Sequence, residues 1–355
     1  MCIAGPPVSM ERIYDQHIKG YHPIISPKEL TSRLPLGQGS KTVMETRHEI
    51  QKILAGKSNK KLMVVGPCSI HDPEAALEYA RRLKKVADKC DKLLIVMRAY
   101  FEKPRTTVGW KGFINDPHHN GTFEMEEGLT QARKLLVDLD QMGLPAGTEA
   151  LDPITIQYFA DLIAWAAIGA RTTESQTHRE MASGLSMPVG YKNTTDGNID
   201  AAINAIKASR VPHTFLGMDE DGRTSIVSTS GNPHGHIILR GGEKPNYDRE
   251  SVAKSVEKLT KAGLPAKIMI DCSHGNTNKD YRRQPIVFRD VVEQMRESDA
   301  IMGMMVESNL FEGNQSISEN MKYGVSITDA CINWESTEEL LLEMQEATWA
   351  TAVAR

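Results

Sequence analysis

Eight polar or ionisable residues stand at the end of eight short apolar runs in this chain, or just past it. In barrels of parallel strands the carboxyl ends of the strands meet at one mouth, where the reacting groups are placed. If each run forms a strand, the eight side chains converge on one cavity, although most are of types rarely buried without a partner or ligand. These residues are Cys68, Arg98, Glu149, Arg171, Lys192, Arg240, His274 and Glu307.

Cations form the first chemical group at this predicted mouth. Six such charges in one cavity repel each other, so they are tolerable if the occupant carries several negative charges, and the arginine fork suits carboxylates and phosphates. A substrate pair with two phosphates and a carboxylate would fit, whereas the alternative is that each arginine pairs with a carboxylate on the barrel rim. The group comprises Arg98, Arg171, Lys192 and Arg240, with Lys103 and Arg105 from the loop AYFEKPRTTVGWKG.

The second group combines Cys68, His274 and Glu307 with Asp329 of the segment SITDACI. A thiolate, an imidazole and two carboxylates together suit a divalent transition metal such as Mn, Fe, Co or Zn. No local spacing motif marks this site, and taken singly Cys68 could be a small buried apolar residue and His274 a structural histidine. Their shared position at strand ends favours a metal site.

The elements that must position these residues are short apolar runs alternating with amphipathic helical patterns, a sequence typical of repeated βαβ units. Eight runs predict a (β/α)8 TIM barrel, which belongs to the α/β class. A helix is predicted over 42–54, and 213–232 predicts a β-hairpin inserted before the sixth strand, a candidate for assembly or regulation. The runs cover 62–66, 93–97, 145–150, 166–170, 188–191, 236–239, 267–270 and 301–306.

The division of the chain follows from composition. Residues 1–45 are rich in Pro and Gly and lack a sustained apolar period, so they are expected to form an N-terminal arm, and 46–355 the catalytic barrel. A net charge of -4 argues against a general nucleic-acid binder. No secretion signal or membrane span is expected, and five cysteines without CxxC spacing indicate a reducing cytoplasm.

Long ordered segments resemble class I 3-deoxy-D-arabino-heptulosonate 7-phosphate (DAHP) synthases, from about residue 42 to the C-terminus. They are GPCSIHDP, MRAYFEKPRTTVGWKGFINDP, GARTTESQTHRE, PVGYKNTTDG, HIILRGG, DCSHGN and VESNLFEGNQ. The resemblance implies a metal-dependent condensation of phosphoenolpyruvate with erythrose 4-phosphate and water. The products are DAHP and phosphate, in the first step of the shikimate pathway to aromatic amino acids.

The resemblance also assigns site residues, motif by motif. One divalent metal ion per subunit would be held by Cys68, His274, Glu307 and Asp329. Phosphoenolpyruvate would be bound by Arg98, Lys103, Glu149, Ala170, Arg171, Lys192 and Arg240. Erythrose 4-phosphate would be bound by Lys103, Pro104, Arg105, Thr106 and Asp329. Direct roles in catalysis are expected for Lys103, Glu149, Cys68 and His274.

Regulation and assembly are implied as well. The hairpin and neighbouring segments resemble the aromatic amino-acid pocket of the tyrosine-inhibited enzymes, in which Gly217 leaves room where the phenylalanine type has a serine. The expected effector residues are Ile156, Leu185, Ser186, Phe215 and Gly217. The family analogy favours a homodimer or homotetramer with the N-terminal arm at a subunit contact. A disulfide between Cys68 and Cys331 would remove the metal thiolate and is a possible oxidative switch.

Two other functions fit parts of the pattern. The first is 3-deoxy-manno-octulosonate 8-phosphate synthase, a related barrel that uses arabinose 5-phosphate, but the segment KPRTTVGWKG argues against it. The second is a noncatalytic regulatory subunit that binds an aromatic amino acid. The complete sets of predicted metal ligands and cations make that improbable, because a binding module has no reason to keep them.

Overall fold

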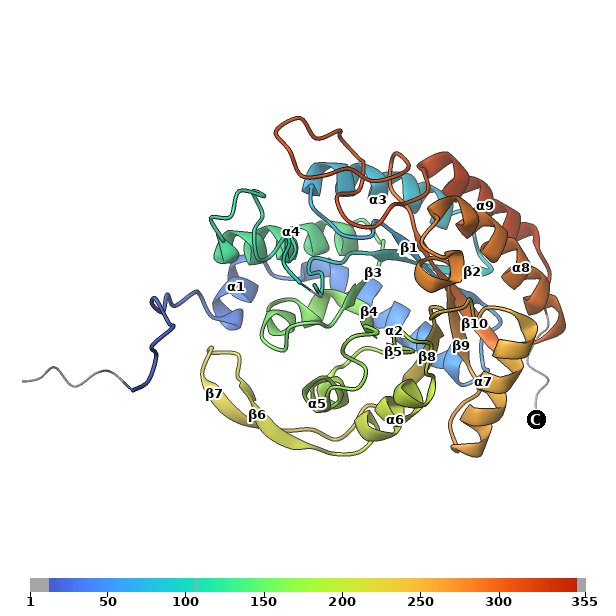
Figure 1. Cartoon of the computed structure of the whole chain (residues 1–355), viewed down its shortest axis with the longest axis horizontal. Helices are drawn as coiled ribbons and strands as arrows, with labels where there is room; N and C mark the ends of the chain where they lie inside the picture. Colours follow the sequence, from blue (N-terminus) through green and yellow to red (C-terminus); the bar gives the residue numbers. More distant parts are fainter. Residues whose placement is uncertain (1–12, 106, 350–355) are drawn as a thin grey trace, which may run out of the picture.

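Eight parallel strands close into a barrel in this computed structural model, which describes residues 13–105 and 107–349. Neighbouring strands follow the order β1-β10-β9-β8-β5-β4-β3-β2, and helices surround them (Figure 1). The strands are β1 (Lys61–Gly66), β2 (Leu93–Arg98), β3 (Ala146–Glu149), β4 (Ile163–Ile168), β5 (Val189–Lys192), β8 (Gly235–Leu239), β9 (Ile268–Asp271) and β10 (Ile301–Glu307). The predicted (β/α)8 barrel is confirmed.

Each of the eight predicted runs contains or overlaps one barrel strand. The largest shift is at β4, which was expected over 166–170 and instead covers Ile163–Ile168. The segment IAWAAI is buried along its whole length, so the strand begins three residues earlier, and the chain turns away after Ile168. A small shift of this kind leaves the residues after the strand at the same end of the barrel.

The helices pack their apolar faces on the outside of the barrel. In α3, Asp72 caps the first turn and Pro73 occupies the first helical position, while Tyr79 and Leu83 are buried. The outer helices are α3 (Pro73–Ala87), α4 (Met125–Gln141), α5 (Gln176–Gly184), α6 (Asp200–Ser209), α7 (Arg249–Lys261), α8 (Gln284–Glu297) and α9 (Trp334–Glu346). Within the described ranges, no helix is both long and apolar enough to cross a membrane.

The amino-terminal end of the barrel is closed by α2 (Ser40–Leu54), which confirms the helix predicted over 42–54. Its Ile50, Ile53 and Leu54 pack in one cluster with side chains of the barrel interior, including Leu62 and Met302. The carboxyl ends of the strands are therefore the end at which a ligand can reach the interior.

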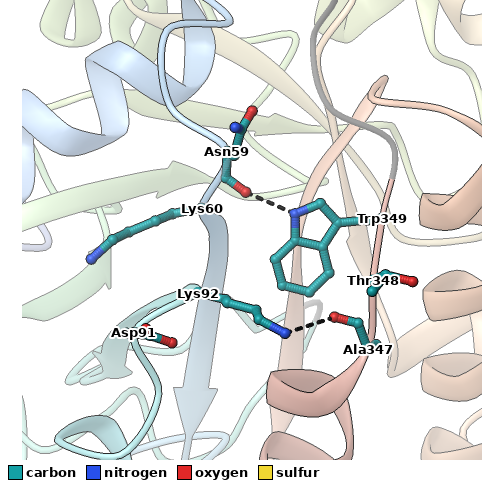
Figure 2. Close-up of a pocket in the computed structure, with 7 residues that line it drawn as sticks. All are labelled: Asn59, Lys60, Asp91, Lys92, Ala347, Thr348 and Trp349. Carbon is teal, nitrogen blue, oxygen red and sulfur yellow. Dashed lines mark hydrogen bonds between the residues drawn. The ribbon is translucent and has the colours of Figure 1, made fainter.

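A cavity of about 360 Å³ lies at this closed end, between the segments that lead into β1 and β2 and the chain after α9 (Figure 2). The Trp349 indole nitrogen donates a hydrogen bond to the carbonyl of Asn59 at 2.8 Å. Lys92 Nζ donates to the carbonyl of Ala347 at 3.3 Å. These contacts hold the chain beyond α9 against the segments that precede β1 and β2, at the end of the barrel opposite the predicted mouth.

The N-terminal segment contains α1 (Pro27–Arg33), whose Leu30 is fully buried in the core, a contact not expected of an arm. The amide of Lys28 donates to the carbonyl of Glu220, and its Nζ lies 3.2 Å from carboxylates of Glu220 and Asp221. The described part of this segment thus contacts the hairpin of its own chain. The boundary at residue 45 and the role at a subunit contact stay predictions.

The inserted hairpin is formed by β6 (Thr214–Met218) and β7 (Thr224–Ser228), as predicted. The two strands pair antiparallel, with Phe215 opposite Val227 and Gly217 opposite Ser225. On the outer face Leu216 and Ile226 stand opposite each other with 77% and 75% of their surface exposed. The hairpin is therefore an appendage whose outer side carries apolar side chains outside the barrel core.

Asp140 of α4 makes stability depend on pH, because its two buried carboxylate oxygens find no hydrogen-bond partner among the described residues. Burial, with a smaller contribution from Asp161, raises its pKa to about 8. Unfolded chains ionise aspartate near pH 4, so this group's contribution to stability is present below about pH 4 and is lost as the pH rises towards about 8. We expect Asp140→Asn to lack that decline. Urea unfolding midpoints at about pH 5 and about pH 9 test this, and equal pH dependence in both proteins contradicts it.

Candidate active site

The residues predicted at the mouth do meet at the carboxyl end of the barrel. Arg98, Glu149, Lys192 and Glu307 are the last residues of β2, β3, β5 and β10. A cavity of about 270 Å³ opens there, and its lining includes Arg240, His274, Glu307 and Asp329. The strand-end pattern in the sequence therefore located a real cavity.

The four predicted metal ligands lie together. One ligand atom each of Cys68, Glu307 and Asp329 lies within 4.8 Å of the others. His274 joins them, because its Nε2 is 3.6 Å from Glu307 Oε1. A sulfur, an imidazole nitrogen and two carboxylates in this arrangement fit a divalent transition metal, so the structure supports a candidate metal centre without giving the identity of the ion.

Two loops approach closely to place His274, which begins the 3-10 helix η4 (His274–Thr277). Its φ of 54° lies in the left-handed region, which is uncommon for residues other than glycine and often marks a functional site. A Cβ at Gly241 would be 2.4 Å from the backbone of Gly275, so glycine is required for the loops after β8 and β9 to touch. The Gly275 amide donates to the carbonyl of Arg240 at 3.0 Å, which links the two loops.

The charges around the candidate metal centre depend on burial and close neighbours. Burial, with Glu307 as the next cause, raises the pKa of Cys68 to about 11, although Lys103 Nζ lies 3.1 Å from its Sγ. Burial would also raise the pKa of Glu307, but His274 and Arg98 outweigh it and leave that pKa below the usual value. A bound divalent cation would favour the thiolate, because a metal deprotonates a coordinating thiol.

Arg98 is buried at the end of β2 and is held on several sides. Its guanidinium donates to the carbonyls of Pro67 and Cys68 at 3.0 and 3.2 Å and to Glu307 Oε1 at 3.0 Å. The Tyr100 ring lies beneath it, with its centroid 3.6 Å from the guanidinium carbon. Arg98 is therefore preorganised, and only part of its donor capacity is free for a ligand.

Glu149 and Lys103, both expected to take part in catalysis, have different surroundings. Glu149 Oε1 is buried and has no hydrogen-bond partner in the described part of the chain. A Cβ at Gly169 would be 2.2 Å from that oxygen, so the glycine makes room for the carboxylate. Burial would lower the pKa of Lys103, but Cys68 and Glu307 raise it above its ordinary value. A carboxylate such as that of Glu149 is able to accept a proton, whereas the raised pKa of Lys103 favours its protonated form.

The cations divide into paired and unpaired members. Arg98 pairs with Glu307 and Lys192 with Asp271, which agrees with rim pairing for these two. In the described ranges no ion pair involves Lys103, Arg171 or Arg240. Burial, together with Arg171, lowers the pKa of Arg240 by more than Asp271, Glu307 and Asp329 raise it, so repulsion between these cations persists. The uncompensated positive charge favours an anionic occupant.

Asp271, the last residue of β9, belongs to this mouth although no role was predicted for it. It is fully buried and contacts both Lys192 and His274. Burial opposes its ionisation, but His274 and Lys192 hold its pKa well below the usual range. The signal was available, because Asp271 ends an apolar run as Glu149 and Glu307 do. His274, three residues further on, was predicted as the functional residue of this strand end instead.

The segment expected to bind the sugar phosphate is only partly described. Pro104 is half-buried and Arg105 is exposed, and Arg105 Nε donates to the carbonyl of Trp110 at 2.8 Å. Thr106 lies outside the described residues. Ala170, expected at the phosphate, follows β4 beside the exposed Arg171. The segment thus leads from the deep Lys103 towards solvent.

The expected effector residues occupy three neighbouring elements. Leu185 and Ser186 follow α5, and the Asn232 side chain after the hairpin donates to the Leu185 carbonyl at 3.0 Å. Phe215 and Gly217 lie on β6. Ile156, in η2 (Thr155–Tyr158), is buried in the hydrophobic core. The segment after α5 and the hairpin are therefore linked by a hydrogen bond. The assignment of an effector pocket stays a prediction.

Cys68 and Cys331 are both buried free cysteines in this structure. Cys331 Sγ lies 3.7 Å from the carbonyl of Asp329, so it is next to a candidate ligand. The two cysteines are not joined by a disulfide here. Its formation under oxidising conditions stays a hypothesis.

The fold and this mouth define a (β/α)8-barrel protein with a cavity at the carboxyl ends of its strands, beside a candidate metal centre. Residues 38–342 match the DAHP synthetase I family, and the chain belongs to that family. This confirms the family and the class of enzyme inferred from the sequence.

Relatives of known designation cover nearly the whole chain. The "Phospho-2-dehydro-3-deoxyheptonate aldolase, Tyr-sensitive" of Escherichia coli is 55% identical over 336 residues, which are 93% of this chain and 94% of the relative. The Phe-sensitive protein of the same organism is 54% identical over 338 residues, 94% of this chain and 97% of the relative. A solved phospho-2-dehydro-3-deoxyheptonate aldolase of Francisella tularensis superposes with a TM-score of 0.91, at 50% identity and with 93% and 98% coverage of the two chains.

Proposed function

We propose that this chain condenses phosphoenolpyruvate with erythrose 4-phosphate and water to give DAHP and phosphate, with one divalent metal ion per subunit. The observation that carries the proposal is the meeting of the buried Cys68 and Glu307 and the exposed Asp329 with unpaired cations at one barrel mouth. Membership of the DAHP synthetase I family supports it. The product would enter the shikimate pathway.

The cations would bind phosphoenolpyruvate in two groups. Arg98 and Lys103 would hold its carboxylate, at the deep end of the cavity. The phosphate would be bound by the backbone at Ala170 and by Arg171, Lys192 and Arg240. This division places the reacting carbons between the deep cations and the candidate metal centre.

The chain's own residues would then guide bond formation. A divalent ion held by Cys68, His274, Glu307 and Asp329 would supply Lewis-acid polarisation of the sugar aldehyde. C3 of phosphoenolpyruvate forms the new bond to the aldehyde carbon, whose oxygen takes a proton. Water adds at C2, where positive charge develops, and gives up a proton to Glu149, with Lys103 as the proton donor. The bond from C2 to the phosphate oxygen then breaks, the departing phosphate takes the proton of the C2 hydroxyl, and the ketone remains.

The tetrose phosphate would approach from the solvent side of the same cavity. Its phosphate would meet the segment from Lys103 to Thr106, with Arg105 as the main exposed cation of the described part, while Asp329 would face its hydroxyls. We further propose a cytoplasmic homodimer or homotetramer, without a nucleic-acid or membrane partner.

Tyrosine is the proposed feedback inhibitor. The identities to the Tyr-sensitive and Phe-sensitive relatives are almost equal, so overall similarity does not choose between the effectors. The choice rests on Gly217 in the hairpin. A Cβ at this position would be 2.8 Å from Val227 Cγ2, so a side chain there would displace its neighbour.

We expect Gly217→Ser to weaken tyrosine inhibition about tenfold, because an added side chain in a filled space costs about 1–3 kcal/mol. Activity without effector should not change, since the hairpin lies outside the barrel. The measurement is the tyrosine concentration for half inhibition, with Ser225→Ala on the partner strand as control. An unchanged value for Gly217→Ser would show that tyrosine does not bind beside Gly217.

The direct test of the proposed function is product formation after stripping with EDTA and adding back single divalent metals. Erythrose 4-phosphate is compared with arabinose 5-phosphate, and each aromatic amino acid is titrated. Metal-restored activity on erythrose 4-phosphate, inhibited by tyrosine, supports every part. Activity only with arabinose 5-phosphate would favour the octulosonate enzyme, and no activity with either sugar would favour the regulatory subunit.

A further inference from the structure

Asp271 contacts both halves of the site through one oxygen. Its Oδ2 accepts a hydrogen bond from Lys192 Nζ at 2.8 Å and lies 2.9 Å from His274 Nδ1. Its Oδ1 accepts from the amide and the hydroxyl of Ser273, at 3.0 and 2.8 Å. The carboxylate is fully buried, so its position is determined by these partners.

On the metal side, Asp271 determines which imidazole nitrogen can bind a cation. A proton on Nδ1 is shared with Asp271 Oδ2 and with the Ser273 hydroxyl oxygen at 2.6 Å. The lone pair is then on Nε2, the nitrogen that faces Glu307. A carboxylate behind a ligating histidine both orients the ring and makes it a stronger ligand.

On the phosphate side, Asp271 competes with the ligand. The Lys192 ammonium is almost completely buried and donates its side-chain hydrogen bond to Asp271. A phosphate dianion at Lys192 must interact with an ammonium group whose positive charge Asp271 already neutralises. The single oxygen Oδ2 therefore divides its interaction between Lys192 and His274.

We propose that Asp271 is a positioning residue that makes metal binding and phosphoenolpyruvate binding reinforce each other. A cation on Nε2 polarises the imidazole and strengthens the Nδ1–H hydrogen bond to Oδ2, which loosens Lys192 for the phosphate. A phosphate on Lys192 leaves Oδ2 to His274 and makes the ring a stronger ligand. The coupling is the same in both directions, as binding linkage requires. This inference rests on the proposed function for its two ligands.

The test measures binding rather than turnover. Mn²⁺ is titrated calorimetrically into the metal-free protein, with and without saturating phosphoenolpyruvate and with no sugar present, after correction for Mn²⁺ bound by free phosphoenolpyruvate. In the unaltered protein we expect phosphoenolpyruvate to lower the Mn²⁺ dissociation constant at least about fivefold. In Asp271→Asn the ratio should fall to about one, and Mn²⁺ affinity alone should fall about 10- to 100-fold.

A second variant keeps the inference testable if Asp271→Asn does not fold. Lys192→Gln leaves Oδ2 to His274, so Mn²⁺ should bind without phosphoenolpyruvate at least as tightly as in the unaltered protein, while the coupling is lost. The control is Asp161→Asn, which removes the carboxylate that pairs with Arg133 elsewhere in the fold. It should keep the coupling.

Three results separate the possible failures. Coupling that persists in Asp271→Asn or in Lys192→Gln overturns the inference. Independent binding of the two ligands to the unaltered protein overturns it as well, and leaves the proposed function standing. An unaltered protein that binds neither Mn²⁺ nor phosphoenolpyruvate contradicts the proposed function itself.

Discussion

Cys68→Ala should lose metal binding and turnover together. The Cys68 sulfur is fully buried, lies 3.7 Å from Asp329 and belongs to the group of ligand atoms within 4.8 Å of one another. Removing the thiolate leaves no soft ligand in the site, so we expect Mn²⁺ affinity to fall by more than about 100-fold. Calorimetric titration and the product assay at matched metal concentrations measure the two effects.

The matched control for this variant is Cys90→Ala, another buried free cysteine, which precedes β2 at the opposite end of the barrel. It removes the same group without touching the candidate metal centre, so metal affinity and rate should stay normal. Full metal occupancy and an ordinary rate in Cys68→Ala would remove Cys68 from the site.

Arg98→Lys should have the second large effect, although it keeps the positive charge. Lysine cannot reproduce the fork that donates to the Pro67 carbonyl, the Cys68 carbonyl and Glu307, nor the stacking on Tyr100. The lysine would therefore be misplaced for the phosphoenolpyruvate carboxylate. Loss of two charge-assisted hydrogen bonds to that carboxylate is worth about 3 kcal/mol or more, so KM for phosphoenolpyruvate should rise roughly 100-fold. Steady-state kinetics at saturating sugar measures this change.

Arg133→Lys separates binding from folding in this experiment. Arg133 is also fully buried and makes a two-pronged ion pair, with Asp161, but it lies outside the mouth. Both variants should lower the urea unfolding midpoint, since each disturbs the ion pair of a fully buried arginine. KM for phosphoenolpyruvate should rise only in Arg98→Lys. A comparable rise in both variants would mean that the effect comes from loss of stability.

The sequence predicted the fold well because its signals are local. A run such as LMVVG, followed by a polar strand end and an amphipathic helix, carries the barrel pattern within a few dozen residues. The same reasoning located Cys68, Arg98 and Glu307, because the carboxyl ends of parallel barrel strands all lie at the same end of the barrel. The hairpin followed from alternation on either side of a turn.

Pair contacts were beyond what the sequence can show. Nothing local indicates that Asp271 meets Lys192, which is 79 residues away, or that Lys28 meets the hairpin turn. The burial of Leu30 was also not predicted, because the few apolar residues of this Pro- and Gly-rich segment form no sustained period. Such contacts depend on how distant segments are brought together by the closed barrel.

In the described part of the chain, α2 plugs the amino-terminal end of the barrel, so a ligand reaches the interior from the carboxyl ends of the strands. This has consequences for kinetics under the proposed function. Arg98 lies at the deep end and is 1% exposed, whereas Arg105 reaches solvent. Phosphoenolpyruvate must then settle first, since a sugar phosphate seated on the outer segment would block its path. A tetrose that arrives early would form a dead-end complex and slow the reaction at high sugar concentration. The different depths of the two subsites would thus determine the order in which the two substrates bind.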